Sequence, residues 1–315
     1  MGTSQEHIKM NILVVGSEGF LGTHVTKKLK KDTSFDVSEI RGKKDIDITN
    51  FQKLNDYLSH IKPEIVINCA AFVGGISYGY KYPAKMLYLN STMAINLYLA
   101  SANNSVRKLI NPISNCAYPG SLTTYREKDF FTGPPDESVY NYGISKRLYV
   151  QLGKSFFEEK EFSSVNIVFS NMYGPKDHFD PERSHALGAI IKKVFDAKKN
   201  NKDEVIIWGT GKPIREWLYV EDGADSLIKS IELSDGHQFF NIGVEKGISI
   251  IDLAEVIRQK LGWEGKFVLD KSKPDGVLEK KVDGTLGQKK LNWSPQVNLE
   301  QGIEKTISWY QEIYE

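Results

Sequence analysis

Cysteine is scarce in this sequence: only Cys69 and Cys116 occur among its 315 residues. Two thiols are too few for the disulfide framework of a secreted domain, so we expect a reducing compartment, the cytoplasm. Long apolar runs are missing as well, since no stretch approaches the roughly 18 apolar residues of a membrane-crossing helix. The polar start, MGTSQEHIKM, matches neither a secretory signal nor the myristoylation pattern. We therefore expect no membrane partner.

An excess of charge of one sign is also missing. The 41 Lys and Arg residues nearly balance the 40 Asp and Glu residues, which leaves a net charge of +1. Such a balance gives no broad attraction for nucleic acid, so any anionic ligand must be held by a local cluster of donors. We expect no nucleic-acid partner and no metal ion in the site.

Short apolar runs of strand length alternate with longer helical patterns in the first half of the chain. The expected strands are 11–15, 36–40, 64–68, 108–114 and 164–170, and the clearest helical patterns are 49–61 and 84–103. Thr49 stands where a capping residue would begin the first of these helices. This order predicts an α/β fold with a Rossmann-like, doubly wound parallel sheet.

After Asn171 the order of helices and strands becomes mixed, which indicates a smaller α/β domain that binds the substrate. The segment REWLYVEDGADSLIKSI, followed by FFNIG, is expected to return the chain to the main domain. The predicted domains are therefore discontinuous. The cofactor domain is 10–172 with about 214–244, and the substrate domain is about 173–213 with 245–315.

A glycine-rich turn, GSEGFLG, follows the first expected strand and contains Gly16, Gly19 and Gly22. Glycines there permit a tight turn, close approach of the backbone to a pyrophosphate, and packing of the next helix, whose N-terminus attracts anions. The spacing GxxGxxG is a weak signal alone, because glycines in such a turn are often only conformational. In this strand-to-helix context it predicts a dinucleotide site.

Basic residues follow the second expected strand, in the stretch SEIRGKKDIDI. An acidic side chain at this point would bind a ribose 2′-OH, whereas a basic one would meet the 2′-phosphate of NADP. Arg41 therefore favours NADP(H), while Lys43 and Lys44 are equally well explained as solvated loop charges. Glu18, in the glycine turn, weighs against NADP.

Tyr142 and Lys146 stand four residues apart in YNYGISK, on one face of an expected helix. A phenol with a pKa of about 10 needs a nearby cation to exchange protons near neutral pH, and a lysine one turn away supplies it. About one Tyr-x-x-x-Lys pair is expected by chance in a chain of this composition. This pair, however, follows the strand end SNCAYPG, which holds Ser114 and Cys116.

On these motifs the chain resembles the extended short-chain dehydrogenase/reductase family and, within it, the GDP-L-fucose synthase subfamily. The resemblance runs from Met10 over nearly the whole chain, and it rests on GSEGFLG, NCAAFVGGI, YPAKMLYLN, SNCAYP, YNYGISK, NMYGPKDHF, RSHALGAI, WGTGKPIREWLYVED and KPDGVLEKKVD. It implies a Rossmann-like fold, NADPH as cofactor and a GDP-4-keto-sugar as substrate. It also implies C3/C5 epimerisation followed by C4 reduction, and a homodimer.

The resemblance assigns roles to five residues. A C4 ketone acidifies the hydrogens at C3 and C5, so epimerisation needs a base and an acid on opposite ring faces; these would be Cys116 and His185. Ser114 and Tyr142 would hydrogen-bond the C4 oxygen. Lys146 would lower the pKa of the Tyr142 phenol and hold the nicotinamide ribose.

The resemblance also implies the residues that bind the ligands. The cofactor contacts, besides Tyr142 and Lys146, would be Gly16, Gly19, Phe20, Leu21, Gly22, Arg41, Asp47 and Ala70. The substrate contacts would be Asn171, Lys193, Trp208, Arg215, Asp275 and Lys280. Arg215 follows a glycine-rich turn, and its planar fork suits a bidentate bond to a phosphate.

Alternatives stay open at several of these positions. Cys116 taken alone fits a buried core cysteine. His178 competes with His185, and Lys193 stands where the subfamily tends to carry arginine. Lys176 and His178 depart from the usual residues of the GPKDHF stretch, which leaves open another keto sugar, such as a GDP-heptose. A plain 4-reductase and a non-catalytic cofactor-binding relative are the remaining alternatives.

Overall fold

A computed structural model of the chain describes residues 9–180, 183–273, 275 and 277–314. Its strands are β1 (Met10–Val15), β2 (Phe35–Ile40), β3 (Ile65–Asn68), β4 (Lys108–Ser114), β5 (Thr124–Tyr125), β6 (Ser163–Phe169), β7 (Asn171–Tyr173), β8 (Glu204–Trp208), β9 (Ile214–Tyr219), β10 (His237–Ile242), β11 (Gly247–Ser249), β12 (Lys266–Asp270) and β13 (Glu279–Val282). Its helices are α1 (Phe20–Leu29), α2 (Phe51–Ile61), α3 (Ile76–Lys81), α4 (Pro83–Asn103), α5 (Tyr140–Lys160), α6 (Ala186–Lys199), α7 (Val220–Lys229), α8 (Ile250–Leu261), α9 (Thr285–Leu291) and α10 (Leu299–Tyr314). Short 3-10 turns are η1 (Asn115–Ala117), η2 (Glu127–Asp129), η3 (Glu137–Val139) and η4 (Ser230–Glu232).

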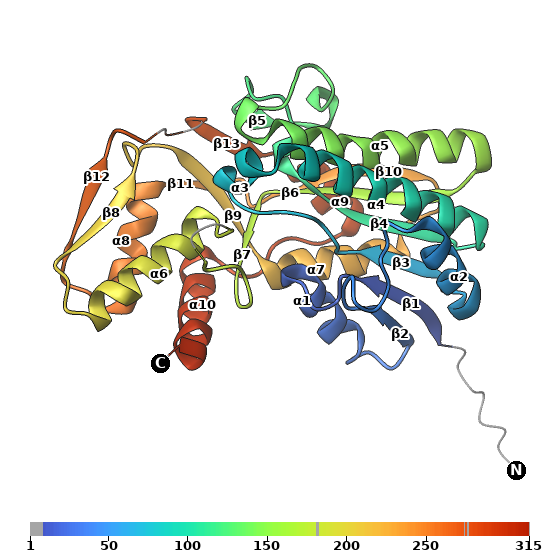
Figure 1. The fold of residues 1–315 in the computed structure, drawn as a ribbon, viewed down its shortest axis with the longest axis horizontal. Coiled ribbons are helices and arrows are strands. Elements are labelled where there is room, and N and C mark those ends of the chain that lie inside the picture. Colours follow the sequence, from blue (N-terminus) through green and yellow to red (C-terminus); the bar gives the residue numbers. More distant parts are fainter. Residues whose placement is uncertain (1–8, 181–182, 274, 276, 315) are drawn as a thin grey trace, which may run out of the picture.

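The main sheet is parallel and has six strands in the order β10-β6-β4-β3-β1-β2 (Figure 1). The chain runs from β1 to its neighbour β2 and then crosses to β3 on the other side of β1. The order therefore reverses between β1 and β3, and in open α/β sheets ligands bind beyond the carboxyl ends of the strands at such a point. The predicted fold class is confirmed.

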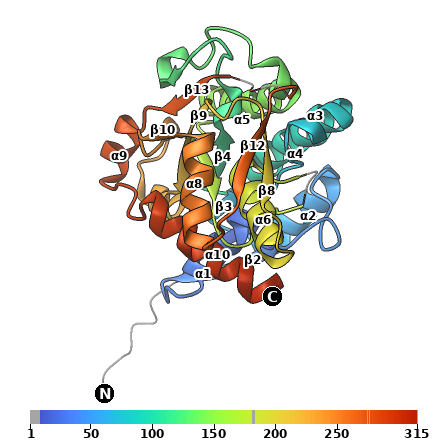
Figure 2. The ribbon, with the colours of Figure 1, turned by 90° about the vertical axis from the view of Figure 1, so that its left-hand side faces the viewer.

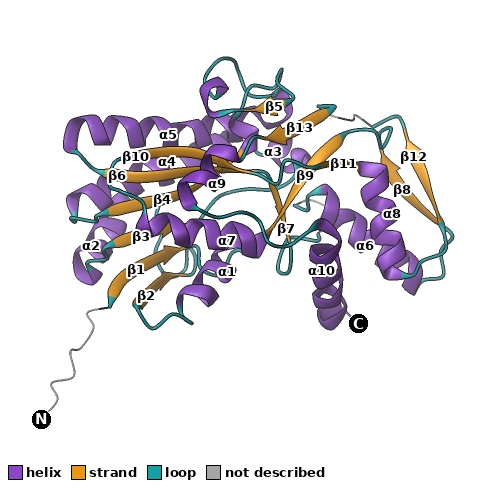
Figure 3. Ribbon diagram, turned by 180° about the vertical axis from the view of Figure 1, so that it is seen from behind, coloured by secondary structure: helices purple, strands orange, loops and turns teal. Residues whose placement is uncertain are grey.

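Helices cover both faces of this sheet, which explains why its strands are apolar without alternation. Leu13 and Val15 of β1 pack in one core with residues of α2, α4 and α5. Ile12 and Val14 pack in another core with residues of α1 and α7. Figure 3 shows α4 and α5 on one side of the strands and α1 and α7 on the other.

The cap of α2 differs from the expected one. Asn50, not Thr49, is the N-cap, because its side chain accepts a hydrogen bond from the Lys53 N–H at 3.1 Å. The Thr49 hydroxyl instead donates to Asp47 at 2.6 Å. Both residue types are good caps, so only the path of the preceding loop decides between them. Among the described residues, no helix combines the length and hydrophobicity needed to cross a bilayer.

The segments beyond β6 build a second part of the molecule with a core of its own. There the strands β11, β9, β13 and β5 form a sheet in that order, and β7 is its fifth strand, paired with β9. The strands β8 and β12 form a separate pair. Figure 2 shows α6, α8 and α10 grouped around the β8–β12 pair. The chain rejoins the first part through α7, which packs on α1, and β10, which pairs with β6. Although 214–219 was assigned to the cofactor domain, it pairs only with strands outside the main sheet; the domain boundaries stay a prediction.

Candidate active site

A cleft of about 1290 Å³ lies at the carboxyl ends of the main-sheet strands, between them and the second part of the molecule. It is wide enough for more than one nucleotide, since pockets for a single small molecule measure about 300–1,000 Å³. The predicted site residues that line it are Gly16, Gly19, Phe20, Leu21, Arg41, Asp47, Ala70, Ser114, Cys116, Tyr142, Lys146, Asn171, His185, Lys193, Trp208, Arg215, Asp275 and Lys280. Gly22 is not part of the lining. The roles assigned to these residues stay predictions.

The glycine turn brings backbone close to backbone at the floor of the cleft. Gly16 has φ +78°, and a Cβ on it would lie 2.8 Å from the backbone nitrogen of Ala70. A Cβ on Gly22 would lie 2.0 Å from the carbonyl oxygen of Gly16, so Gly22 lets α1 pack against the turn. Gly19 is the N-cap of α1 and makes no side-chain cap. The turn thus offers an accessible helix N-terminus, which suits a pyrophosphate.

Charged residues surround the end of β2. The Arg41 side chain is 62% exposed, and its Nε lies 4.0 Å from a Glu18 carboxylate oxygen. Lys43 pairs with Asp47 at 3.0 Å. Hydrogen bonds from Thr49, together with Lys43, lower the pKa of the Asp47 carboxyl. Arg41 therefore lines the cleft with a longer ion-pair contact than Lys43, which leaves its guanidinium available to a ligand.

The end of β4 presents Ser114 and Cys116. The Ser114 hydroxyl oxygen accepts a hydrogen bond from the Cys116 N–H at 3.2 Å, which starts the turn η1. Gly143 lets α5 come close to this turn, because a Cβ there would lie 2.5 Å from the Cys116 carbonyl oxygen. Tyr142, one residue earlier, is thereby placed near Cys116, which contributes to the raised pKa of its phenol.

Lys146 lies one helical turn after Tyr142, and both groups are enclosed by protein. Burial lowers the pKa of Lys146 to about 8. Burial also raises the pKa of Tyr142 above its usual value, and the Cys116 thiol adds to this rise. Burial disfavours a phenolate away from water. Lys146 is not among the groups that shift the Tyr142 pKa, so the expected lowering of that pKa by Lys146 stays a prediction.

Two histidines face the cleft on the segment that leads into α6. His185 is the N-cap residue of α6, and His178 follows the short loop after β7. Surrounding protein atoms lower the pKa of His185 although the residue is exposed to the cleft, and a proton on the nearby His178 would lower it further. Both imidazoles therefore stay neutral near pH 7. Their position alone does not decide between them as proton-exchanging groups.

Cations and an indole line the far end of the cleft. Arg215 of β9 and Lys280 of β13 are direct neighbours in the register of two paired strands, which places their side chains on one face. The Lys193 ammonium donates to the Ile206 carbonyl oxygen at 2.9 Å and lies 5.5 Å from the centroid of the Trp208 ring. The Trp208 side chain is itself 57% exposed. The cations suit a diphosphate, and the indole suits a nucleobase.

Asp275 and Asn171 are held by hydrogen bonds at the edge of this cation group. Asp275 accepts from the backbone N–H and the hydroxyl of Thr210, both at 2.7 Å, and so fixes the turn after β8. The Asn171 amide donates to the Glu216 carbonyl oxygen at 3.2 Å. Both side chains line the cleft, but part of their hydrogen-bonding capacity already serves the protein.

The family model described as "NAD dependent epimerase/dehydratase family" matches residues 12–243. The chain belongs to this family. A GDP-L-colitose synthase of Yersinia pseudotuberculosis is 35% identical over 305 residues, 96% of this chain and 98% of that protein. A putative GDP-L-fucose synthase 2 of Arabidopsis thaliana is 32% identical over 302 residues, 96% and 92% of the two chains. The resemblance stated from the motifs is confirmed, and the chain is an enzyme of this epimerase/dehydratase family.

Solved structures of the same architecture agree with the family. A GDP-L-fucose synthetase from Naegleria fowleri bound to NADP is 26% identical, with a TM-score of 0.87 and coverage of 97% of this chain and 95% of that one. A GDP-6-OMe-4-keto-L-xylo-heptose reductase from C. jejuni is 23% identical, with a TM-score of 0.90 and coverage of 97% and 99%. The second likeness shows the fold.

Several cleft residues of this epimerase/dehydratase family member escaped the sequence analysis. Asp177 lines the cleft beside His178, and burial raises its pKa to about 7. Arg183 also lines it, and its Nε is buried without a hydrogen-bond partner among the described residues. Asp177 stands in NMYGPKDHF and Arg183 in RSHALGAI, but neither motif gave these two residues a role, since the loop from β7 to α6 has no regular period. Gly143, inside YNYGISK but outside the cleft lining, carried a usable signal, because a glycine early in a helix indicates close backbone contact.

Proposed function

We propose that the protein converts GDP-4-keto-6-deoxy-D-mannose to GDP-L-fucose by epimerisation at C3 and C5 followed by reduction at C4. The observation that carries the proposal is that Cys116 and His185 line the same cleft as Tyr142 and Lys146. A plain 4-reductase needs only a proton donor for the C4 oxygen. A second pair of proton-exchanging groups in that cleft is what epimerisation adds.

The cofactor is NADP(H). The glycine turn fits its pyrophosphate, since Gly16 and Gly22 remove the Cβ atoms that would block the approach. Arg41, exposed beside this turn, would pair with the 2′-phosphate. The solved relative with NADP bound supports the same cofactor. When bound, NADPH supplies the hydride for C4.

The proposed epimerisation uses four side chains. Cys116 and His185 remove and return the protons at C3 and C5 from opposite faces of the sugar ring. Cys116 is the base of this pair, and His185, the N-cap residue of α6, is the acid. The hydroxyls of Ser114 and Tyr142 donate hydrogen bonds to the C4 oxygen and stabilise the enolate charge that develops there.

The proposed reduction uses Tyr142 as proton donor to the C4 oxygen. Its raised pKa keeps the phenol protonated before the reaction, which is the form that a donor needs. Lys146, whose pKa is about 8, is largely protonated at neutral pH and stabilises the phenolate that forms. Arg215 and Lys280 bind the diphosphate, and Trp208 contacts the nucleobase of the substrate.

The identity of the sugar is the finer part of this proposal. The alternatives that keep the same cleft are another GDP-4-keto sugar, such as a GDP-heptose, and a plain 4-reduction. The relative named GDP-L-colitose synthase, at 35% identity, makes the keto precursor of GDP-L-colitose a further substrate to assay.

The first experiment incubates the protein with GDP-4-keto-6-deoxymannose and NADPH in deuterated water. NADPH oxidation is followed by absorbance, and deuterium at C3 and C5 by mass spectrometry. Wild type should yield GDP-fucose labelled at both carbons. Cys116→Ser should still oxidise NADPH but give an unepimerised product, and His185→Gln should lose exchange at one carbon or both.

Matched variants separate these roles from general damage. Cys69→Ala removes the other thiol, whose pKa burial raises to about 12, and should leave exchange intact. His178→Gln should retain exchange if His185 is the acid. NADPH oxidation without ring deuterium in the wild type would make the protein a plain 4-reductase. No turnover would point to another keto sugar or to a non-catalytic relative.

We also propose a homodimer that covers the outer faces of α4 and α5. These helices lie side by side and expose Leu87, Tyr88, Ile95 and Phe157. Exposed apolar side chains on adjacent helices are typical of a subunit contact. Light scattering should give twice the chain mass for the wild type, and Ile95→Glu should give the single chain mass.

A further inference from the structure

The loop after β7 carries Asp177 and His178 into the cleft. Within this loop, Gly174 has φ +151° and Lys176 has φ +69°. A lysine in the left-handed region costs about 1 kcal/mol, so contacts elsewhere must hold the loop in this conformation. A Cβ on Gly188, in the first turn of α6, would lie 3.1 Å from the carbonyl oxygen of His178, so the loop packs against the helix that His185 caps. The shape of this loop therefore affects the surroundings of His185.

Two contacts pin the loop at its start. A Cβ on Gly174 would lie 2.4 Å from a methyl carbon of Val220, so the backbone passes directly over the first residue of α7. The carbonyl oxygen of Pro175 lies 2.9 Å from Nε2 of His24, which belongs to α1. A carbonyl oxygen only accepts, so Nε2 carries the proton and donates. His24 thus joins α1, the helix that follows the glycine turn, to the loop after β7.

Glu221 lies on the opposite side of the His24 ring from the loop. The His24 side chain is 8% exposed, and Nδ1 lies 3.8 Å from a carboxylate oxygen of Glu221 on α7. Burial lowers the pKa of His24, so the ring is neutral at pH 7 and acts through its single N–H. The hydrogen bond from Nε2–H to the Pro175 carbonyl oxygen and the burial of the side chain fix the orientation of the ring, because the unprotonated Nδ1 has no proton to donate to Glu221.

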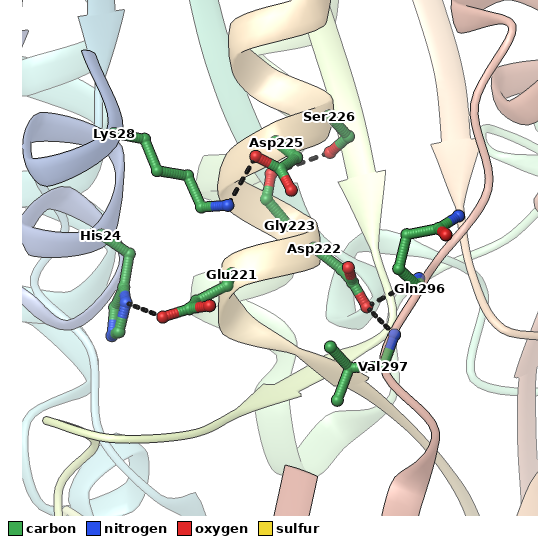
Figure 4. A network of polar contacts seen from close by, with 9 residues as sticks. All are labelled: His24, Lys28, Glu221, Asp222, Gly223, Asp225, Ser226, Gln296 and Val297. Atoms are coloured by element: carbon green, nitrogen blue, oxygen red, sulfur yellow. Dashed lines mark hydrogen bonds and ion pairs between the residues drawn. The ribbon is translucent and has the colours of Figure 1, made fainter. Parts of the chain in front are cut away.

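An ion pair joins the same helices without touching the loop. Lys28, one turn further along α1, pairs with Asp225 of α7 at 2.7 Å, next to the contact between His24 and Glu221 (Figure 4). Asp222 faces away from them and accepts from the backbone N–H groups of Gln296 and Val297. Of these two residues of α1, His24 contacts the loop and Lys28 contacts α7, which makes Lys28 a matched control.

We propose that His24 is a positioning residue for proton exchange: its bond to the Pro175 carbonyl holds the Asp177–His178 loop beside His185. The proposal rests on the proposed function, since it concerns the half of the reaction that His185 would serve. The hydride half uses Tyr142 and Lys146, which lie on α5 and not on this loop. Loss of the bond should therefore affect the two halves unequally.

The test measures ring-proton exchange separately from cofactor binding. GDP-4-keto-6-deoxymannose is incubated in deuterated water with NADP⁺, so that no reduction occurs, and deuterium uptake is followed by mass spectrometry. His24→Leu should slow exchange about tenfold, as expected when one hydrogen bond that orients a reacting group is lost. Its NADPH dissociation constant, from nicotinamide fluorescence, and that of Lys28→Met should stay within about twofold of wild type.

Conservative variants complete the test. His24→Gln keeps an amide N–H that reaches the Pro175 carbonyl and should recover exchange to within about threefold of wild type. His24→Asn keeps the amide but is one methylene shorter; it should resemble His24→Leu and replaces that variant if it does not fold. Thermal midpoints of all four variants identify any general loss of structure.

Three results would overturn the proposal. Equal slowing in His24→Leu and Lys28→Met would mean that docking of α1 on α7, rather than the loop contact, matters. A parallel loss of NADPH affinity in His24→Leu would place the effect in the cofactor helix. A wild type that exchanges no ring protons overturns the proposed epimerisation itself, and this proposal with it, before any variant is compared.

Discussion

The ammonium nitrogen of Lys146 lies 5.5 Å from the centroid of the Tyr142 ring and 3.4 Å from the Pro112 carbonyl oxygen. It thus faces the ring rather than bonding the hydroxyl, and burial raises the pKa of Tyr142 while lowering that of Lys146 to about 8. The resting site therefore pairs a protonated phenol with a cation that gives up its proton more readily than usual. Both properties suit a proton donor that must be reprotonated after each reaction.

Tyr142→Phe should separate reduction from epimerisation. Without the hydroxyl, the rate of C4 reduction should fall by about 10² to 10⁴, the usual contribution of a positioned acid. Ring exchange should continue more slowly, since Ser114 still donates to the C4 oxygen. Single-turnover NADPH oxidation and deuterium uptake measure the two steps. Tyr314→Phe, at a tyrosine of α10 that is 50% exposed and outside the cleft lining, is the control and should change neither; equal loss of both steps in Tyr142→Phe would contradict the division.

The buried charge of Lys146 should appear in the pH dependence of stability. Its pKa is about 8 in the folded protein and 10.5 when unfolded, so the unfolded state binds more protons between these values. Wild type should therefore gain stability relative to Lys146→Met as the pH rises from 7 to 10, by about 2 to 3 kcal/mol. Urea unfolding of both ligand-free proteins measures the difference. Parallel stability curves would mean that Lys146 is not desolvated.

Gly22 should tolerate no side chain, although it stands outside the cleft lining. A Cβ there would meet the Gly16 carbonyl oxygen at 2.0 Å, and neither backbone segment can move without displacing α1. Gly22→Ala should cost about 3 kcal/mol and abolish NADPH binding. Gly42→Ala is the matched control, because a Cβ there meets nothing within 4 Å, and should change stability by less than about 0.5 kcal/mol. Calorimetry of both variants decides.

Local patterns were enough to predict much of this molecule. The strands β1, β3 and β4 appear in the sequence as continuous apolar runs because helices cover both faces of their sheet. The turn from Gly16 to Gly22 carries its own backbone requirement. Tyr142 and Lys146 share a helix face because of their spacing alone. In each of these cases the information lies within about ten residues.

Long-range contacts limited the rest. Nothing in the sequence around Ile214 shows that β9 leaves the main sheet to pair with β7, β11 and β13. The raised pKa of Tyr142 depends on how completely the protein encloses it, which spacing does not reveal. His24 stood inside an expected helix with no sign that it would reach Pro175, 151 residues away.

Glu18 should weaken NADPH binding through Arg41. Its carboxylate lies 4.0 Å from the Arg41 guanidinium, and both side chains are mostly exposed, so the pair itself contributes little stability. A 2′-phosphate bound by Arg41 would meet the negative charge of Glu18. Glu18→Gln should therefore tighten NADPH by about two- to fivefold, and Arg41→Ala should weaken it by about tenfold, because one charge-assisted contact is gained or lost. NADH lacks this phosphate, so its dissociation constant, from nicotinamide fluorescence, should stay the same in both variants. Equal changes for NADH and NADPH would place Arg41 away from the 2′-phosphate.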